Sequence, residues 1–387
     1  MLINGLTARK ILNSNSNFTI EVKLSTHKGL FRGSSPAGES TSKYEVSQFS
    51  GGIDSVVDGF NKFLSTLKNK KIETVDDIFG IERSISKEFI GGPSLSLSYA
   101  LIYGLSNDLS IEPYELFGGK NEVTPVCKIL GGGVHASGLS MDMQEILVMT
   151  LADSINERVE STLAVYKDVK DELKKKNIGF LGGVDPEGGF VTGMDDYESL
   201  ALVKKSVEKI AEERGSDIRI GIDAAASTFF KDGKYHYKKP LYGKRLVTRE
   251  EQSDMIVKLA EEFDIYYIED PVDEDFPDGY KYVKDHTKAL VIGDDMTATV
   301  TERLEKVHDS INSTLIKPNQ VGTIEKVVEY SKLADKYGLS KVMSHRSEET
   351  PISIITDIGI GLAAKYLKIG INRGERTEKI NRLMELN

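Results

Sequence analysis

From about residue 124 onwards, short β-rich runs recur at a near-constant interval, and each run ends in an ionisable residue. After Glu269, the steps between these ends are 25, 23, 28 and 23 residues long. One strand, one helix of about eleven residues and two short loops fill such a step. Repeated strand–helix units of this size predict a parallel sheet. The ends are, in order, Asp223, Glu269, Asp294, Lys317, His345 and Lys368.

One step in this series is longer than the others. It runs for 46 residues, from Asp223 to Glu269, and contains the segment FFKDGKYHYKK (229–239). There an Asp-Gly pair separates two aromatic runs, which predicts an inserted hairpin. A doubly wound open sheet is the competing architecture, but no G-x-G-x-x-G follows a first strand. We therefore predict an α/β fold with a TIM-like (β/α)8 barrel.

The N-terminal part has a different pattern. Residues 17–32 alternate between apolar and polar and predict an antiparallel hairpin, while the small polar residues 34–45 predict a loop. Residues 52–115 have mostly helical periodicity. We expect a smaller N-terminal α+β domain over residues 1–122 and the barrel domain over residues 123–387.

Composition narrows the classes of function. The chain has 387 residues and a net charge of −10, without the basic clusters typical of nucleic-acid or membrane-surface binding. It has no run of eighteen apolar residues and no signal-peptide pattern at its start. The single cysteine, Cys127, excludes an internal disulfide and a multi-cysteine metal site. We expect a cytoplasmic protein with neither nucleic acid nor membrane as a partner.

The strand ends themselves indicate chemistry. In a parallel barrel the carboxyl ends of all strands face one mouth, so Asp223, Glu269 and Asp294 would meet there. Such an oxygen-rich site suits Mg²⁺. Lys317 and Lys368 lie on the same rim, and a lysine beside a divalent cation can act as a base. A single acidic residue here would be read as a helix cap, but six consecutive ionisable ends favour a site.

Several motifs in this order resemble those of the enolase family. They are M-Q-E (143–145), P-E-G-G-F (186–190), I-G-I-D-A-A-A-S (220–227), I-E-D-P (268–271), G-D-D (293–295), L-I-K-P-N-Q-V-G-T (315–323) and S-H-R-S (344–347). The resemblance extends over almost the whole chain. It implies an enolase-type barrel and the Mg²⁺-dependent, reversible dehydration of 2-phosphoglycerate to phosphoenolpyruvate and water.

The resemblance also implies roles for the matching residues. Asp223, Glu269 and Asp294 are expected to bind a first Mg²⁺ ion, and Ser40, in the loop PAGEST, a second one. Lys317 is expected to remove the proton beside the substrate carboxylate. That proton is weakly acidic, and its removal builds negative charge that metal ions and a lysine can stabilise.

Other residues are matched to the leaving group, the carboxylate and the phosphate. Glu187 is expected to protonate the departing hydroxyl, and a like charge on Glu145 would help it to keep that proton. Lys368 is expected to hold the carboxylate. The resemblance assigns the remaining substrate contacts to His135, His345, Arg346 and Ser347.

The sequence departs from the family mainly in loops. The family pattern P-S-G-A-S-T-G here has Glu39 in place of alanine, and S-H-R-S-G-E-T has Glu348 in place of glycine. N-G-G-S-H-A has Gly131 in place of asparagine and Val134 in place of serine. G-D-E-G-G is Asp185-Pro186-Glu187-Gly188-Gly189, and D-S-R-G-N-P is Asn13-Ser14-Asn15-Ser16-Asn17-Phe18.

Three interpretations follow from these features. The chain is a working, divergent enolase, a related lyase acting on another carboxylate substrate, or a non-catalytic relative that acts as a binding or scaffold protein. The intact candidate metal ligands, base and acid favour the first. The phosphate-binding S-H-R-S segment argues against the second. The resemblance also implies a homo-oligomer, either a dimer or an octamer.

Overall fold

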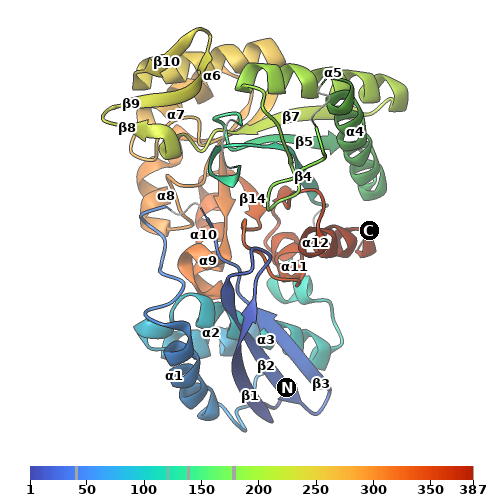
Figure 1. Cartoon of the computed structure of the whole chain (residues 1–387). Coiled ribbons are helices and arrows are strands. Elements are labelled where there is room, and N and C mark those ends of the chain that lie inside the picture. Colours follow the sequence, from blue (N-terminus) through green and yellow to red (C-terminus); the bar gives the residue numbers. More distant parts are fainter. Residues whose placement is uncertain (40–41, 120–121, 137–139, 177–179, 387) are drawn as a thin grey trace.

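The computed structural model of the chain describes residues 1–39, 42–119, 122–136, 140–176 and 180–386. The N-terminal elements, blue in Figure 1, form a small sheet covered by helices, and the rest of the chain forms a closed barrel. Among the residues described, no helix is both long and apolar enough to cross a membrane.

The N-terminal sheet has three antiparallel strands in the order β1 (Gly5–Leu12), β2 (Phe18–Thr26) and β3 (Gly29–Ser34). The predicted hairpin is confirmed as the β2–β3 pair, and β1 is a third strand that the sequence analysis did not predict. The predicted helical stretch is also confirmed. It contains α1 (Ile53–Ser65), α2 (Val75–Ser84), η1 (Lys87–Phe89), α3 (Gly92–Leu109) and η2 (Pro113–Phe117).

Helix α3 packs against β2 and β3. The alternate residues Ile20, Val22 and Leu24 of β2 are fully buried, as the period of two in a half-buried strand requires. Gly33 in β3 permits the close approach of α3, because a Cβ atom at this position would lie 2.2 Å from the carbonyl oxygen of Ser96. The neighbour is helix backbone, which cannot rotate away as a side chain can.

We expect Gly33→Ala to destabilise the fold by about 1–3 kcal/mol, because the helix must shift to admit the methyl group. Urea unfolding followed by circular dichroism would measure the loss. Gly5→Ala, in β1, is the matched control, because a Cβ atom there would have no atom within 4 Å. Equal stability of the two variants would contradict the packing argument.

The barrel has eight strands: β4 (Thr124–Gly131), β5 (Glu145–Leu151), β7 (Asp217–Asp223), β11 (Ile265–Glu269), β12 (Leu290–Gly293), β13 (Ser313–Ile316), β14 (Ser340–Ser344) and β15 (Tyr366–Lys368). Pairing of β15 with β4 closes it. Buried side chains from these strands, among them Val126, Tyr267 and Leu315, pack together in a separate apolar cluster. The predicted TIM-like barrel is therefore confirmed.

Strand β5 departs from the parallel arrangement that the repeated units from Asp223 onwards predict. This strand pairs antiparallel with both β4 and β7. Only a 3-10 turn, η3 (Gly133–His135), is described between β4 and β5, whereas a parallel neighbour requires a longer crossover, usually helical. The reversal puts the first residue of β5, Glu145, opposite Gly131 and Asp223, at the carboxyl ends of its neighbours.

The helices that follow the strands are α4 (Ile155–Lys176), α5 (Asp196–Arg214), α6 (Arg249–Phe263), α7 (Pro277–His286), α8 (Thr301–Val307), α9 (Pro318–Val321), α10 (Ile324–Lys336), α11 (Ile354–Gly361) and α12 (Gly374–Glu385), with η5 (His308–Ser310) after α8. Local sequence explains where α6 starts and ends. The Thr248 hydroxyl accepts a hydrogen bond from the amide of Glu251, and Asp264 ends the helix in the left-handed conformation.

The long step between Asp223 and Glu269 holds η4 (Ala226–Phe229) and a small antiparallel sheet. Its strands are β8 (Phe230–Lys231), β9 (Lys234–Leu241) and β10 (Lys244–Val247). The predicted inserted hairpin is confirmed and is extended by the third strand. A further short strand, β6 (Phe190–Val191), pairs with the end of β4.

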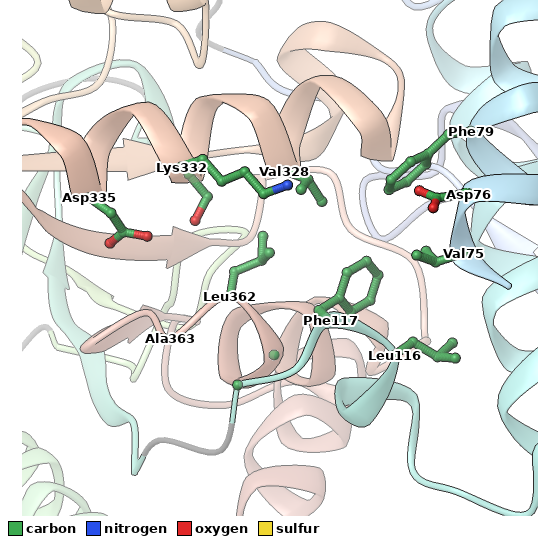
Figure 2. Close-up of a pocket in the computed structure, with 13 residues that line it drawn as sticks. Val75, Asp76, Phe79, Leu116, Phe117, Val328, Lys332, Asp335, Leu362 and Ala363 are labelled. Carbon is green, nitrogen blue, oxygen red and sulfur yellow. The ribbon is translucent and has the colours of Figure 1, made fainter.

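A groove of about 400 Å³ lies between the N-terminal elements and the barrel. Figure 2 shows Val75 and Phe79 of α2 facing it, with Phe117 of η2 and Val328 of α10. It shares no lining residue with the cavity at the barrel mouth that is described next.

Candidate active site

A small polar cavity of about 20 Å³ lies at the mouth of the barrel. Eight of its ten lining residues are sequence-predicted site residues: His135, Glu145, Glu187, Lys317, His345, Arg346, Ser347 and Lys368. Gln144 and Ser344 complete the lining. Gln144 lies in the M-Q-E motif, which could have identified it.

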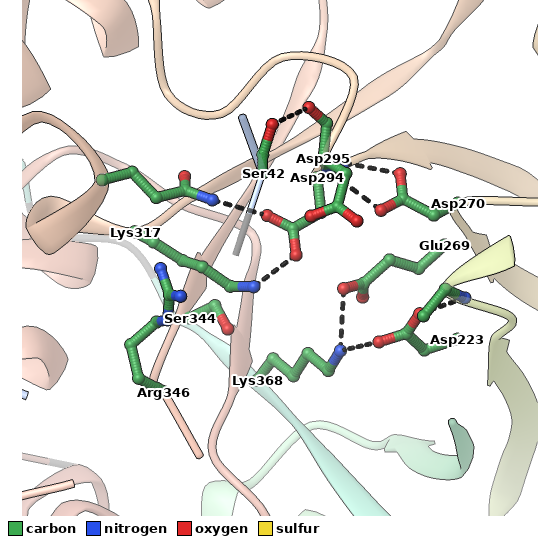
Figure 3. Close-up of polar contacts among 12 residues, drawn as sticks. Ser42, Asp223, Glu269, Asp270, Asp294, Asp295, Lys317, Ser344, Arg346 and Lys368 are labelled. Atoms are coloured by element: carbon green, nitrogen blue, oxygen red, sulfur yellow. Dashed lines mark hydrogen bonds and ion pairs between the residues drawn. The ribbon is translucent and has the colours of Figure 1, made fainter. Parts of the chain in front are cut away.

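Lys368 stands between carboxylates. Its ammonium lies 2.8 Å from Asp223 Oδ2 and 2.8 Å from Glu269 Oε1 (Figure 3). It also lies 3.4 Å from Glu145 Oε1. Burial opposes the charge of this lysine, but these carboxylates outweigh burial and raise the pKa of Lys368 well above its usual value. The ammonium is therefore a fixed positive charge at the mouth.

Lys317 occupies the next part of the mouth. Its ammonium pairs with Asp294 Oδ2, and Gln320 donates a hydrogen bond to Asp294 Oδ1 at 3.0 Å (Figure 3). Thr299 accepts from the Lys317 amide and donates to Gln320, which orients both residues. Burial lowers the pKa of Lys317, but Asp294 outweighs it and the net shift is upward.

The candidate metal ligands Asp223, Glu269 and Asp294 come from neighbouring strand ends and are buried. Burial, followed by the charge of Asp223, raises the pKa of Glu269 to about 8. Crowded, buried carboxylates of this kind suit a divalent cation, which would relieve their repulsion. Ser40, the candidate for a second ion, lies outside the described residues.

Asp270 holds the turn that carries Asp294. Its carboxylate accepts hydrogen bonds from the amides of Asp294 and Asp295, at 3.0 and 2.9 Å, and from the Tyr280 hydroxyl at 2.6 Å. Ligand atoms of the three aspartates lie within 4.8 Å of one another. Because these bonds engage both oxygens of Asp270, its role in this arrangement is to position Asp294.

Glu145 and Glu187 face each other across the cavity with opposite pKa shifts. Burial and the charge of Glu187 raise the pKa of Glu145 well above its usual value. Burial acts on Glu187 too, but Lys128, His135 and His345 outweigh it and lower the pKa of Glu187 well below its usual value.

The sequence predicts the proton of this pair on Glu187, whereas the opposed pKa shifts favour Glu145 as the residue that keeps it. The reason is the ammonium of Lys128, which lies 3.0 Å from Glu187 Oε2 and 3.7 Å from Glu145 Oε1. Sequence analysis missed Lys128. Its only signal was a charged residue inside the apolar strand VCKIL.

The candidate phosphate-binding residues lie together after β14. Arg346 donates to Glu45 Oε2 at 2.8 Å and to Asn319 Oδ1 at 3.2 Å. Arg376 is fully buried and donates to the carbonyl oxygens of Arg346 and Ser347, both at 2.7 Å. This holds the turn in shape and leaves the Ser347 hydroxyl to accept from the Glu39 amide at 2.9 Å.

Glu39 and Glu348, two of the residues that depart from the family pattern, form hydrogen bonds with asparagines near the start of the chain. Glu348 accepts hydrogen bonds from Asn13 at 2.7 Å and Asn17 at 2.8 Å. Glu39 accepts one from Asn15 at 2.7 Å. Asn13 and Asn15 are themselves departures, whereas Asn17 keeps the asparagine of the family pattern. Among the described contacts, the added carboxylates bind these amides rather than the candidate phosphate-binding Arg346.

The loop after Ser40 is fastened to the barrel. The Ser42 hydroxyl donates to Glu274 at 2.7 Å and to the carbonyl of Asp295 at 2.9 Å. Asp275 pairs with Lys43 at 2.5 Å and accepts from the Tyr44 hydroxyl at 3.0 Å. These contacts bring the segment that follows Ser40 against the mouth.

Comparison with known proteins gives a consistent result over the full chain. The family model described as "Enolase, C-terminal TIM barrel domain" matches residues 122–387. The enolase of Pyrobaculum aerophilum is 30% identical, over 100% of this chain and 96% of the relative. The enolase of Sulfolobus acidocaldarius is 33% identical, over 99% and 95%, and that of Methanocorpusculum labreanum 31%, over 99% and 98%.

Proposed function

The chain belongs to the enolase family, and from that membership we propose that it reversibly dehydrates 2-phosphoglycerate to phosphoenolpyruvate and water. The observation that carries the proposal is the composition of the cavity. One small space is lined by the buried Lys368 and the partly buried Lys317, a pair of glutamates with opposed pKa shifts and the Arg346–Ser347 turn. The reaction requires a carboxylate site, a base, an acid and a phosphate site, and these groups could supply all four.

Positive charge holds the substrate at both ends. Lys368, which stays charged among Asp223, Glu145 and Glu269, would attract the substrate carboxylate. Arg346 and Ser347 would bind the phosphate, since a guanidinium offers a fork of donors that matches phosphate oxygens. When bound, Mg²⁺ ions held by Asp223, Glu269 and Asp294, and by Ser40, would supply the further positive charge that makes the carbon-bound proton acidic enough to remove.

The two bond-breaking steps fall to different residues. Lys317 would take the proton from the carbon beside the carboxylate, and the electron pair left behind would form the new double bond. The carbon–oxygen bond would then break, and the glutamate pair would give a proton to the departing hydroxide to form water. To act as a base, Lys317 must first lose a proton that the charge of Asp294 stabilises.

We expect chelation of divalent metal to reduce phosphoenolpyruvate formation to background and added Mg²⁺ to restore it. Absorbance at the wavelength of the enol phosphate, with saturating 2-phosphoglycerate, measures this directly. Asp223→Asn should remove activity by lowering metal affinity, while Asp217→Asn, at the exposed start of the same strand, should leave it. If the wild type forms no phosphoenolpyruvate at saturating Mg²⁺, the proposal fails and a different carboxylate substrate or a binding role is favoured.

A further inference from the structure

Lys128 is a third lysine beside the cavity, and the proposed reaction does not use it. It lies in the interior of β4 with a fully buried side chain, yet it does not line the cavity. Its ammonium lies 2.6 Å from Asp185 Oδ2, 3.0 Å from Glu187 Oε2 and 2.8 Å from His135 Nδ1. The free energy cost of burying a charge is high unless it is paired, so these contacts must offset it.

The position of the Asp185 carboxylate, which pairs with Lys128, requires a glycine at residue 131. A Cβ atom at Gly131 would lie 2.1 Å from Asp185 Oδ2, so any larger residue at 131 would displace the carboxylate. The family pattern has asparagine at 131 and glycine at 185, and both differ here. The two departures are therefore complementary, because one removes a side chain from the space that the other fills.

Asp185 is itself held in place. Its Oδ1 accepts hydrogen bonds from the amides of Glu187, at 2.9 Å, and Gly189, at 3.0 Å. Gly188, between them, has a φ of +92°, and a Cβ atom there would lie 2.5 Å from the Asn372 side-chain oxygen. The turn that carries Glu187 is thus built around the carboxylate that anchors Lys128.

Lys128 also determines the tautomer of His135. An ammonium can only donate, so His135 Nδ1 must accept, and the neutral ring then carries its proton on Nε2. Burial and the charge of Lys128 lower the pKa of His135 to about 3, so the ring is neutral. Nε2 is buried and has no hydrogen-bond partner among the described residues. Because His135 lines the cavity, this N–H is available to a substrate oxygen.

Charged and titratable groups surround Glu187 on several sides. His345 Nε2 lies 3.8 Å from Glu187 Oε1, opposite the contacts of Lys128 and His135 with Oε2. Arg376 adds positive charge, whereas Glu145, Glu39 and Asp185 add negative charge. Among the described contacts, Lys128 is the cation that comes within 3.0 Å of the Glu187 carboxylate.

On the basis of the proposed function, we propose that Lys128 is a positioning residue that Asp185 anchors. Lys128 holds Glu187 as a carboxylate and His135 as its Nε2–H tautomer. Glu187 then presents an acceptor and His135 a donor to the hydroxyl that departs or, in the reverse direction, to the water that adds. Lys128, Gly131 and Asp185 would act together, since Gly131 leaves the space for the Asp185 carboxylate and that carboxylate pairs with Lys128.

NMR of Lys128→Met tests this without turnover, because methionine removes the charge and keeps most of the volume. In wild type, the ¹⁵N signals of His135 should show protonated Nε2 and unprotonated Nδ1, and the labelled Glu187 carboxyl should titrate at low pH. In Lys128→Met, we expect loss of the single tautomer and an upward shift of the Glu187 midpoint by about one pH unit or more. His135→Gln and Glu187→Gln assign the signals.

Two further variants separate this effect from a loss of folding. Lys341→Met removes another buried lysine, in β14, that binds Ser331, Asp335 and the Leu362 carbonyl, and it should change neither signal. Lys128→Met combined with Asp185→Gly removes both charges, so Asp185 is not left as an unpaired carboxylate, and it should reproduce the NMR changes. An unchanged His135 tautomer and Glu187 midpoint in both Lys128 variants would overturn the proposal.

Kinetics distinguish failure of this proposal from failure of the proposed function. If the protein catalyses the dehydration, Lys128→Met should lower kcat by about tenfold or more, change KM by less than about threefold and move the pH optimum upward. The upward direction follows because Glu187 without Lys128 keeps its proton to higher pH. A wild type without turnover would refute the proposed function, while the NMR result would still decide the role of Lys128.

Discussion

Lys317→Ala should abolish exchange of the carbon-bound proton of 2-phosphoglycerate with solvent deuterium, and with it all turnover. A positioned base contributes about 10²–10⁴-fold to a rate, and the pairing of Lys317 with Asp294 places its amine at the cavity. Proton NMR of the substrate in D₂O, with saturating Mg²⁺, measures exchange separately from elimination.

The control for Lys317→Ala is Lys336→Ala, on the exposed last turn of α10, which should exchange at the wild-type rate. Lys317→Ala leaves Asp294 without its lysine partner, but Asp294 keeps the hydrogen bond from Gln320. Its near-ultraviolet circular dichroism should therefore match that of the wild type. Exchange that survives in a folded Lys317→Ala protein would remove Lys317 as the base.

Glu187→Gln should separate the two steps. We expect proton exchange to persist, because Lys317 is untouched, while elimination falls by about 10²–10⁴-fold, because the glutamate pair that supplies a proton to the departing hydroxide loses one of its two carboxyl groups. The same D₂O experiment, combined with the absorbance assay, measures both rates on one sample. The amide keeps the size of the side chain and an acceptor for the 3.0 Å contact with Lys128.

Glu212→Gln, on the exposed face of α5, is the matched control for Glu187→Gln and should change neither rate. An equal fall of exchange and elimination in Glu187→Gln would show that Glu187 takes part in proton removal as well as in elimination. Loss of elimination alone would leave open which member of the glutamate pair carries the proton before substrate binds, and the titration of the Glu187 carboxyl answers that question.

The spacing of strand ends predicted the barrel because each strand–helix unit needs nearly the same length of chain. That spacing held for the barrel strands from β7 to β15, each of which ends in an ionisable residue or is followed directly by one. The spacing does not extend to β5, which carries its candidate site residue, Glu145, at its start. Strand direction depends on the length and structure of the connection, and the 132–144 segment gives no helical period from which to judge it.

The residues of the candidate site also divide into those that the sequence could predict and those that only the fold brings together. Residues at the end of a strand or just after it, such as Lys368 and Lys317, stood out in the sequence because a charge there interrupts an apolar run at a boundary. Lys128 interrupts a run as well, but its partners Asp185 and Glu187 lie more than fifty residues away along the chain. Only the fold brings them together. The expected domain boundary after residue 122 and the homo-oligomeric state remain predictions.

Closure of the barrel by β15 against β4 has a consequence for how the chain acquires its site during synthesis. Tyr366 pairs with Thr124, and Lys368 reaches Asp223 only when that pairing is made. The N-terminal sheet and α3 draw their contacts from nearby sequence and can form early. Until the last strand emerges from the ribosome, β4 and β14 have unpaired edges, which are prone to join other chains. The catalytic mouth would thus be among the last parts of the protein to exist.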